Sequence, residues 1–271
     1  AQDEKSSSSD VVCAQMVLNI ESRAKAEKGD YADKIRSLIK NPKLRSYTSA
    51  ATILSGQKTA KEVLAEAERL ETGRDKIFFL RLWCVENKKQ MDAIDVCLFG
   101  IQTAVDEKDY RPNARDYWEM LSPAENTADV EKAKKVTRII RLQLDDIGKV
   151  GPTEEFHRLK ISLLCIDVNT GSEELASAIK AALIEIGVIQ DLSIRASVSA
   201  YLCAKIKFIS EKAGIKYDLS PTLLQVQAET KELLNSTAEH FREVRSIIAG
   251  LAQCDPDQAL VLCDDLNIEQ R

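Results

Sequence analysis

A scarcity of turn-forming residues restricts the fold of this chain more than any other feature. Ten glycines and six prolines occur among 271 residues, which is about 6% of the chain, where ordinary proteins have roughly 12%. A β-sandwich or β-barrel needs many short turns, and its sheets favour aromatic residues. The chain has only six Phe, six Tyr and two Trp. Long helices joined by short links are therefore expected, and the predicted fold class is all-α.

The charge balance narrows the choice of partners. The chain carries 38 basic and 43 acidic residues, for a net charge of −5. This balance disfavours broad attraction to nucleic acid or to an anionic membrane surface. No stretch approaches the ~18 uninterrupted apolar residues that a membrane span needs. We therefore expect neither a membrane segment nor a nucleic-acid partner.

The cysteines bear on the cellular compartment. There are seven of them, mostly with apolar neighbours, and none stands at CxxC or zinc-ligand spacing. This pattern predicts buried free thiols without a bound metal, in a cytoplasmic protein.

The first ten residues leave an alternative open. Ala1-Gln2-Asp3 is either the end left when a signal peptide is removed during export or a boundary inside a longer chain. We prefer the boundary, because unpaired thiols are a liability in exported proteins. Residues 1–10 are expected to form a flexible leader, and 11–271 a helical array.

Local signals mark where the helices begin and end. In a capping box, a hydroxyl or carboxylate side chain bonds the third backbone N–H of a helix, and the third residue bonds back. Three such boxes are indicated: Thr59 with Glu62, Ser122 with Glu125, and Asp255 with Gln258. Four glycines stand where helices should end: Gly148, Gly187, Gly214 and Gly250. Apolar residues at helical spacing lie between these signals, as in Leu175, Ile179 and Ile186.

An internal repeat is the most informative pattern. Several pairs of expected helices share a polar link followed by one basic residue, at Arg45, Lys76, His157, Arg195 and Arg271. Cys84, Cys165 and Cys203 each lie eight residues after such a position, and Ile53 takes that place after Arg45. The cysteine intervals of 81 and 38 residues correspond to two periods and one period of about 40. The segment Arg111–Met120 is expected to supply the missing member between Lys76 and His157.

This layout resembles the tetratricopeptide-like and HEAT-like α-solenoids. The resemblance is carried by links such as Gln190-Asp191-Leu192-Ser193-Ile194-Arg195 and covers nearly the whole chain from about residue 11. It implies antiparallel helix pairs in about six units of 38–40 residues. The strict tetratricopeptide motif is absent, so only the architecture is inferred. The repeated basic residue either bonds the carbonyls that end the preceding helix or is simply exposed.

A search for catalytic chemistry finds no motif. His157 and His240 are the two histidines, and nothing in the sequence supports pairing of either with a cysteine in a catalytic dyad. Glycine-rich phosphate loops, HExxH and EF-hand loops are absent from the sequence. We expect a protein that is not an enzyme and binds no cofactor.

One candidate binding patch contains the second tryptophan. Trp118 follows Tyr110, Arg111 and Arg115, and Trp and Arg are enriched at binding hot spots. Core packing is the preferred interpretation of Trp118, with a partly exposed aromatic–arginine patch as the alternative. Trp83, within an apolar run, is expected in the core.

A basic cluster is the second candidate. Its members are Lys132, Lys134, Lys135, Arg138 and Arg141. Three of them (Lys134, Arg138 and Arg141) share one helix face. Aromatic residues for base stacking are missing, and acidic residues flank the cluster. A solvated helix face is the preferred interpretation, and a site for an acidic peptide is the alternative.

These observations predict a non-catalytic scaffold. Solenoids present extended concave surfaces, so a protein or peptide partner could bind there without any reaction centre. The alternative is a regulatory or sensor region of a larger effector, such as a signalling ATPase or protease. Both rest on analogy at the level of the fold.

Overall fold

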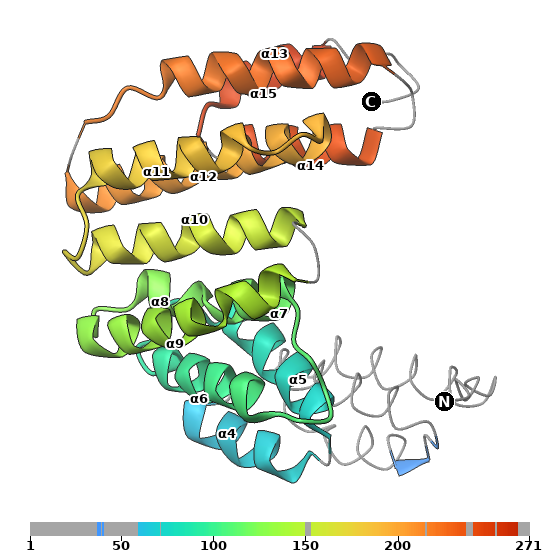
Figure 1. Ribbon diagram of the computed structural model, residues 1–271, viewed down its shortest axis with the longest axis vertical. Coiled ribbons are helices and arrows are strands. Elements are labelled where there is room, and N and C mark those ends of the chain that lie inside the picture. The colour runs from blue at the N-terminus through green and yellow to red at the C-terminus, as the bar shows by residue number, and fades with distance from the viewer. Residues whose placement is uncertain are drawn as a thin grey trace, which may run out of the picture. The chain divides into compact units, whose positions relative to one another are not determined.

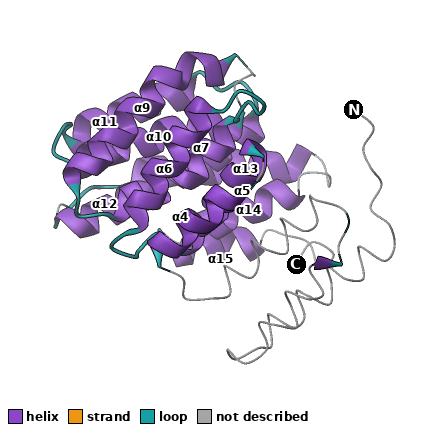
Figure 2. Cartoon of the chain, turned by 90° about the horizontal axis from the view of Figure 1, so that it is seen from below, coloured by secondary structure: helices purple, strands orange, loops and turns teal. Residues whose placement is uncertain are grey.

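The structure is a computed structural model, and its described residues are helices and their links. It describes residues 37, 38, 40, 59–70, 72–149, 153–214, 216–236, 241–252 and 254–264. Figure 2 shows helices and loops, and no strand occurs within these ranges. The all-α prediction is confirmed. The proposed leader at residues 1–10 lies outside the described part of the chain, as do Arg45, Ile53, His240 and Arg271.

Contacts divide the chain into two compact units, Ala1–Gln143 and Leu144–Arg271. The described helices of the first unit are α4 (Ala60–Arg69), α5 (Gly73–Glu86), α6 (Ala93–Asp106), α7 (Ala114–Met120) and α8 (Ser122–Asn126). Helix α9 (Val130–Gly148) crosses the division. Within the first unit, α5 packs against α6 and α7, and α6 also contacts α4 and α8.

The second unit repeats one arrangement of contacts. Its helices are α10 (Glu154–Asn169), α11 (Leu175–Gly187), α12 (Leu192–Ala213), α13 (Ser220–Ser236), α14 (Phe241–Leu251) and α15 (Pro256–Asp264). Each helix packs against the next along the chain, and α12 also contacts both α10 and α14 (Figure 1). Helices two places apart in the sequence are therefore neighbours, with α10, α12 and α14 in one row.

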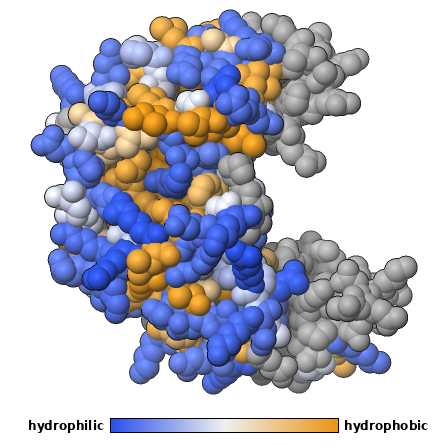
Figure 3. Space-filling view, viewed as in Figure 1, coloured by the Kyte–Doolittle hydropathy of each residue, from blue (hydrophilic) through white to orange (hydrophobic). Residues whose placement is uncertain are grey.

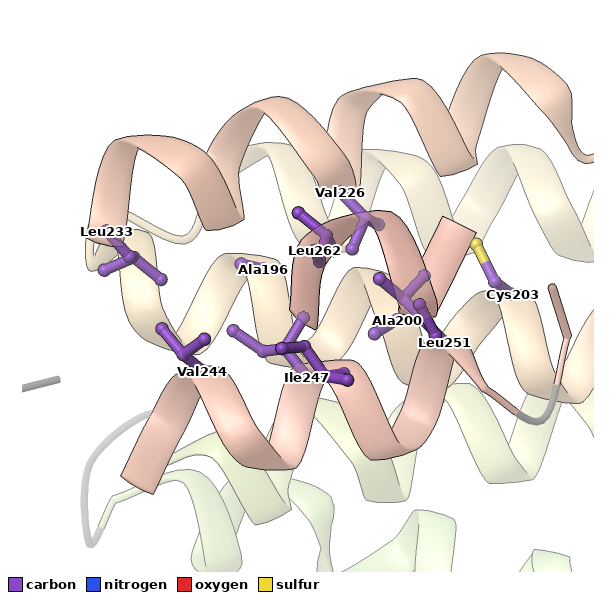
Figure 4. Packing of buried hydrophobic residues seen from close by; sticks show 11 residues of the cluster. Ala196, Ala200, Cys203, Val226, Leu233, Val244, Ile247, Leu251 and Leu262 are labelled. Atoms are coloured by element: carbon purple, nitrogen blue, oxygen red, sulfur yellow. The ribbon is translucent and has the colours of Figure 1, made fainter. Parts of the chain in front are cut away.

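Helix α12 holds this unit together because two of its faces are buried. Val198, Leu202 and Ile206 pack into one core cluster with α10 and α11. Ala196, Ala200 and Cys203 belong to another with α13, α14 and α15 (Figure 4). A helix that is apolar on opposite sides must be covered on both. Small residues on the second face allow α14 to come close, and a Cβ added at Gly250 would lie 3.5 Å from the Ala200 Cβ.

The cap predictions are confirmed in part. Thr59 and Glu62 form the predicted capping box at the start of α4. The box at Ser122 is wrong: Leu121 keeps a right-handed helical conformation (φ −72°, ψ −15°), and Ser122 is the first residue of α8. Gly148 and Gly187 end α9 and α11. Gly214 follows α12 with φ +66°, a left-handed conformation that favours glycine.

Three of the basic positions named in the sequence share one helix register. Lys76, His157 and Arg195 are each the fourth residue of their helices, α5, α10 and α12. Each helix has a cap residue (Thr72, Thr153 and Asp191) whose side chain accepts a hydrogen bond from the third backbone N–H. The cysteines eight residues later are all buried. Segment Arg111–Met120 becomes helical only from Ala114, after the cap at Asn113.

The basic positions of this register differ in their contacts. Arg195 Nη1 donates to the Ile189 carbonyl just beyond α11 at 3.1 Å, as expected for a cation that ends a preceding helix. His157 instead contacts the side chain of Glu185. The carbonyl-bonding interpretation therefore holds for Arg195 and not for His157.

No helix in the described ranges is both long enough and apolar enough to cross a membrane.

Close packing at Gly100 gives a stability prediction. A Cβ there would lie 2.8 Å from Met120 Sδ and 3.4 Å from Leu80 Cβ. Gly100→Val should therefore lower the free energy of unfolding by about 1–3 kcal/mol through overpacking, as measured by urea denaturation. Gly187→Ala is the matched control, because nothing lies within 4 Å of its added Cβ. This control should raise the unfolding free energy by about 0.5–1 kcal/mol, and equal losses in both variants would contradict the packing argument.

Candidate functional site

The first predicted site lies on and just before α7. We call Tyr110, Arg111, Arg115 and Trp118 the α7 patch. Tyr110 and Trp118 are half-buried, and both arginines are exposed. Trp83, in contrast, is 1% exposed and belongs to the core. Core packing therefore accounts for Trp83 fully and for Trp118 only in part.

The buried Asp116 holds the α7 patch in place through its hydrogen bonds. Its carboxylate is 2% exposed, yet it accepts hydrogen bonds from the Tyr110 hydroxyl at 2.7 Å, from the Asn113 backbone N–H at 3.0 Å and from Arg81 at 2.6 Å. The bond from Asn113 completes a capping box at the start of α7. Burial and the neighbouring Asp116 raise the pKa of Tyr110 to about 12, so its hydroxyl remains a donor at neutral pH.

Arg81 joins α5 to α7 through a second carboxylate. Its Nε lies 2.9 Å from Glu119 Oε2, and Glu119 Oε1 also accepts from Arg115 Nε at 2.7 Å. The Arg81 guanidinium stands over the Phe78 ring, 5.1 Å from its centre. Charge pairing inside a protein is favourable when hydrogen bonds satisfy both partners. Arg81 Nη1 donates such a bond to Asp116, whereas Arg81 Nε is close to Glu119 without a well-directed hydrogen bond. This network holds the side chains of Tyr110 and Arg115 in fixed positions.

Sequence reasoning missed Arg81, Asp116 and Glu119. A signal for Arg81 was present, because it is the only charge in the run Phe78–Val85, and a charge inside a buried helix needs a partner. Nothing local identified Asp116, which lies 35 residues away along the chain.

The second predicted site lies on α9, apart from α7. Lys134, Lys135, Arg138 and Arg141 are all exposed on this helix; we call them the α9 basic face. Lys132, grouped with them in the sequence, has a different role: its Nζ lies 2.6 Å from Asp95 Oδ1 of α6. That ion pair links the start of α9 to α6.

A polar network in the second unit contains the one described histidine. His157 Nδ1 is 2.7 Å from Glu185 Oε1, and Lys160 Nζ donates to Glu185 Oε2 at 2.7 Å. In the next pair of helices, Arg195 Nε donates to Glu229 Oε1 at 2.8 Å. His157 is thus engaged with a carboxylate rather than a thiol. The two networks link α10 to α11 and α12 to α13.

Three buried cysteines are poor nucleophiles. Burial raises the pKa of Cys84, Cys97 and Cys203, the last to about 12. A thiol that stays protonated at neutral pH is unreactive. No group of three or more His, Cys, Asp or Glu side chains in the described ranges could hold a metal ion.

Each unit has a hollow lined by described residues. A void of about 10 Å³ between α10, α11 and α12 is lined by apolar side chains such as Ile179 and Leu202 and is near the size of one water molecule. A more open hollow of about 250 Å³ lies at the end of α6, where Phe99, Gln102 and Glu107 line it. Neither combines depth with converging reactive groups.

Hydrophobic residues also reach the surface of the second unit. Figure 3 shows them gathered in a band over α11 and α12. Leu183 and Ile184 of α11 are exposed, and so is Val188 just after it.

Compared with known proteins, the chain matches no family model, no curated protein and no solved structure.

Removing Arg81 should be strongly destabilising. Arg81→Met leaves the buried Asp116 and the half-buried Glu119 without their shared cation, and breaking a buried pair on one side costs about 3–5 kcal/mol. Arg115→Ala removes only an exposed partner of Glu119, for which about 0–1 kcal/mol is expected. Thermal and urea unfolding of both variants would measure the difference. A loss below about 1 kcal/mol for Arg81→Met would show that the network does not anchor α7.

The network at Glu185 predicts a dependence of stability on pH. Burial opposes ionisation of Glu185, but hydrogen bonds from Lys160 and His157 outweigh burial and hold its pKa below the usual value. Its contribution should be complete above the unfolded pKa of about 4.3 and disappear as the pH falls through the lower folded pKa. Glu185→Gln should destabilise the protein at neutral pH and match wild type in acid. Urea midpoints across the acid range would test this, and a gap independent of pH would contradict it.

Proposed function

We propose that this chain is an α-solenoid scaffold that binds a protein or peptide partner and catalyses no reaction. The observation that carries the proposal is the row of α10, α12 and α14, in which helices two places apart in the sequence pack together. Stacking of alternate helices is how helical repeats build one continuous core. The recurrent cap, basic residue and cysteine of α5, α10 and α12 support the same interpretation.

The α7 patch supports the proposal that the scaffold binds a partner. Hot spots in protein interfaces are enriched in Trp, Tyr and Arg and lie on well-packed supports. Trp118 and Tyr110 are half-buried, and Asp116 and Glu119 hold Tyr110 and Arg115. A patch that is ordered before binding loses less conformational entropy when a partner docks.

Selection from a displayed peptide library would test this function directly. The purified chain should enrich a family of related peptides, whose affinities are then measured by fluorescence anisotropy. Trp118→Ala should weaken the selected peptides by about 30-fold, as expected for loss of a hot-spot residue. Arg111→Glu, at an exposed position, should also weaken them.

Tyr217→Ala provides the matched control, since Tyr217 is an aromatic residue 40% exposed in the second unit. It should leave the affinities unchanged, and circular dichroism should show all variants folded. Failure to enrich any peptide family would overturn the scaffold proposal. Peptides that bind Trp118→Ala as well as wild type would remove the α7 patch from it.

A further inference from the structure

Helices α12 and α14 come close together where small residues meet. A Cβ added at Gly250 would lie 3.5 Å from the Ala200 Cβ. Figure 4 shows the two helices running in the same direction, from Ala196 to Cys203 and from Val244 to Leu251. Because the helices are parallel, residues one turn beyond this crossing on each of them are held near one another.

Cys254 lies one turn beyond Gly250, at the end of α14. Its backbone N–H donates to the Leu251 carbonyl at 2.9 Å, and its thiol donates to the Gly250 carbonyl at 3.4 Å. Lys207 Nζ of α12 donates to the Cys254 carbonyl at 3.1 Å, and Lys207 follows Cys203 by one helical turn. Cys254 is thus held against the turn of α12 that begins at Cys203.

The two thiols also belong to one core cluster. Cys203 is fully buried within it, and the half-buried Cys254 packs against it. Burial, and in second place the neighbouring Cys254, raise the pKa of Cys203 to about 12. The influence of one thiol on the other agrees with the proximity that the helix contacts give.

Another cysteine packs against the same cluster but is badly placed to pair with Cys254. Cys263 lies in the last turn of α15, whereas Cys254 precedes the first residue of that helix, Pro256. At 1.5 Å per residue, the helix carries Cys263 about 10 Å along its axis from Pro256. A disulfide needs Cα atoms roughly 4.4–6.8 Å apart. Cys203 is therefore the better partner for Cys254.

We propose that Cys203 and Cys254 form a site of reversible oxidation, at which a low-molecular-weight disulfide converts the two thiols into one intramolecular disulfide. The new bond ties the end of α14 to α12. It adds a covalent link where the Lys207 hydrogen bond and apolar packing already join these helices. This inference does not depend on the proposed scaffold function.

The reaction consists of two exchange steps. Cys254 reacts first, because its thiol is half-buried and that of Cys203 is fully buried. The Cys254 thiolate attacks one sulfur of the small disulfide, and the other sulfur leaves as a thiolate. The Cys203 thiolate then attacks the Cys254 sulfur of this mixed disulfide and expels the second small thiolate. The two protein thiols give up two electrons and two protons, which the small disulfide takes up as it becomes two thiols.

The ionisation of each thiol sets the rate of its step. Burial raises the pKa of Cys254, although Lys207 and the Asp255 backbone N–H oppose that rise. The first step should therefore quicken as the pH rises above neutral. Cys203 is seldom ionised, but a thiolate of high pKa is a strong nucleophile, and the sulfur it attacks is held close to it.

Exchange with bis(2-hydroxyethyl) disulfide, a small neutral disulfide, tests the proposal on the reduced full chain at about pH 8.5. Peptide mapping by mass spectrometry should find Cys254 linked to Cys203, and dithiothreitol should restore both thiols. In urea the preference should reverse. Cys254 is nine residues from Cys263 and fifty-one from Cys203, so loop closure in the unfolded chain favours Cys263 by about tenfold.

Single variants separate the roles of the two thiols. Cys203→Ala should trap Cys254 as a mixed disulfide with the reagent. Cys254→Ala should leave Cys203 reduced, because its thiol is fully buried. Cys263→Ala is the matched control, since it changes another half-buried cysteine packed against the same cluster. It should form the link as wild type does, and circular dichroism should show that each variant is folded.

Three results with the wild-type chain would overturn the proposal. They are a Cys254 that stays reduced in the folded protein, a link from Cys254 to any other cysteine in the folded protein, and the same pairing in urea as in the folded protein. None of them requires a variant to fold. None involves peptide binding either, so the scaffold proposal and this one can fail separately.

Discussion

Burial of two opposite faces of α12 is the constraint on which the second unit depends. One face completes the core of α10 and α11, and the other completes the core of α13, α14 and α15. Neither cluster can be closed without this helix, because each draws several of its fully buried residues from it. The pairwise contacts of neighbouring helices follow from that requirement, and so does the need for small residues such as Ala200 where α14 crosses.

In the first unit, the packing of α5 must accommodate a charge as well as apolar residues. Arg81 lies among apolar residues of α5, and its charge is balanced by Asp116 and Glu119 of α7. Here two helices are joined by ion pairs as well as by apolar packing. Such a network is directional, and it fixes α7 more narrowly than apolar contact alone would do.

What could be predicted from the sequence was local. Thr59 and Glu62 are three residues apart, so their capping box was visible in the sequence and is present. Ser122 has the same local signature, but Leu121 continues the helical path from α7 and leaves no cap position. Pairing of Arg81 with Asp116, or of His157 with Glu185, spans 35 and 28 residues. Such pairings depend on how helices are packed, which a single sequence does not specify.

For the candidate sites, too, only features local to one helix could be predicted from the sequence. Exposure of Arg138 and Arg141 followed from helical spacing, because the apolar positions of α9 define its buried side. The separate role of Lys132 depended on Asp95 of another helix and could not be inferred. The contacts of Arg81 with Asp116 and Glu119 could not be inferred for the same reason.

The repelling cations of α9 have a consequence for how the protein responds to its solution. Dissolved salt screens exposed charges over about 8–10 Å at physiological concentration. Screening relieves the repulsion between Lys134 and Arg138, and it also weakens their attraction for any anionic molecule. Raising the ionic strength should therefore favour pairing-independent folding of this stretch, so the segment is best folded under the conditions in which it attracts an anion least.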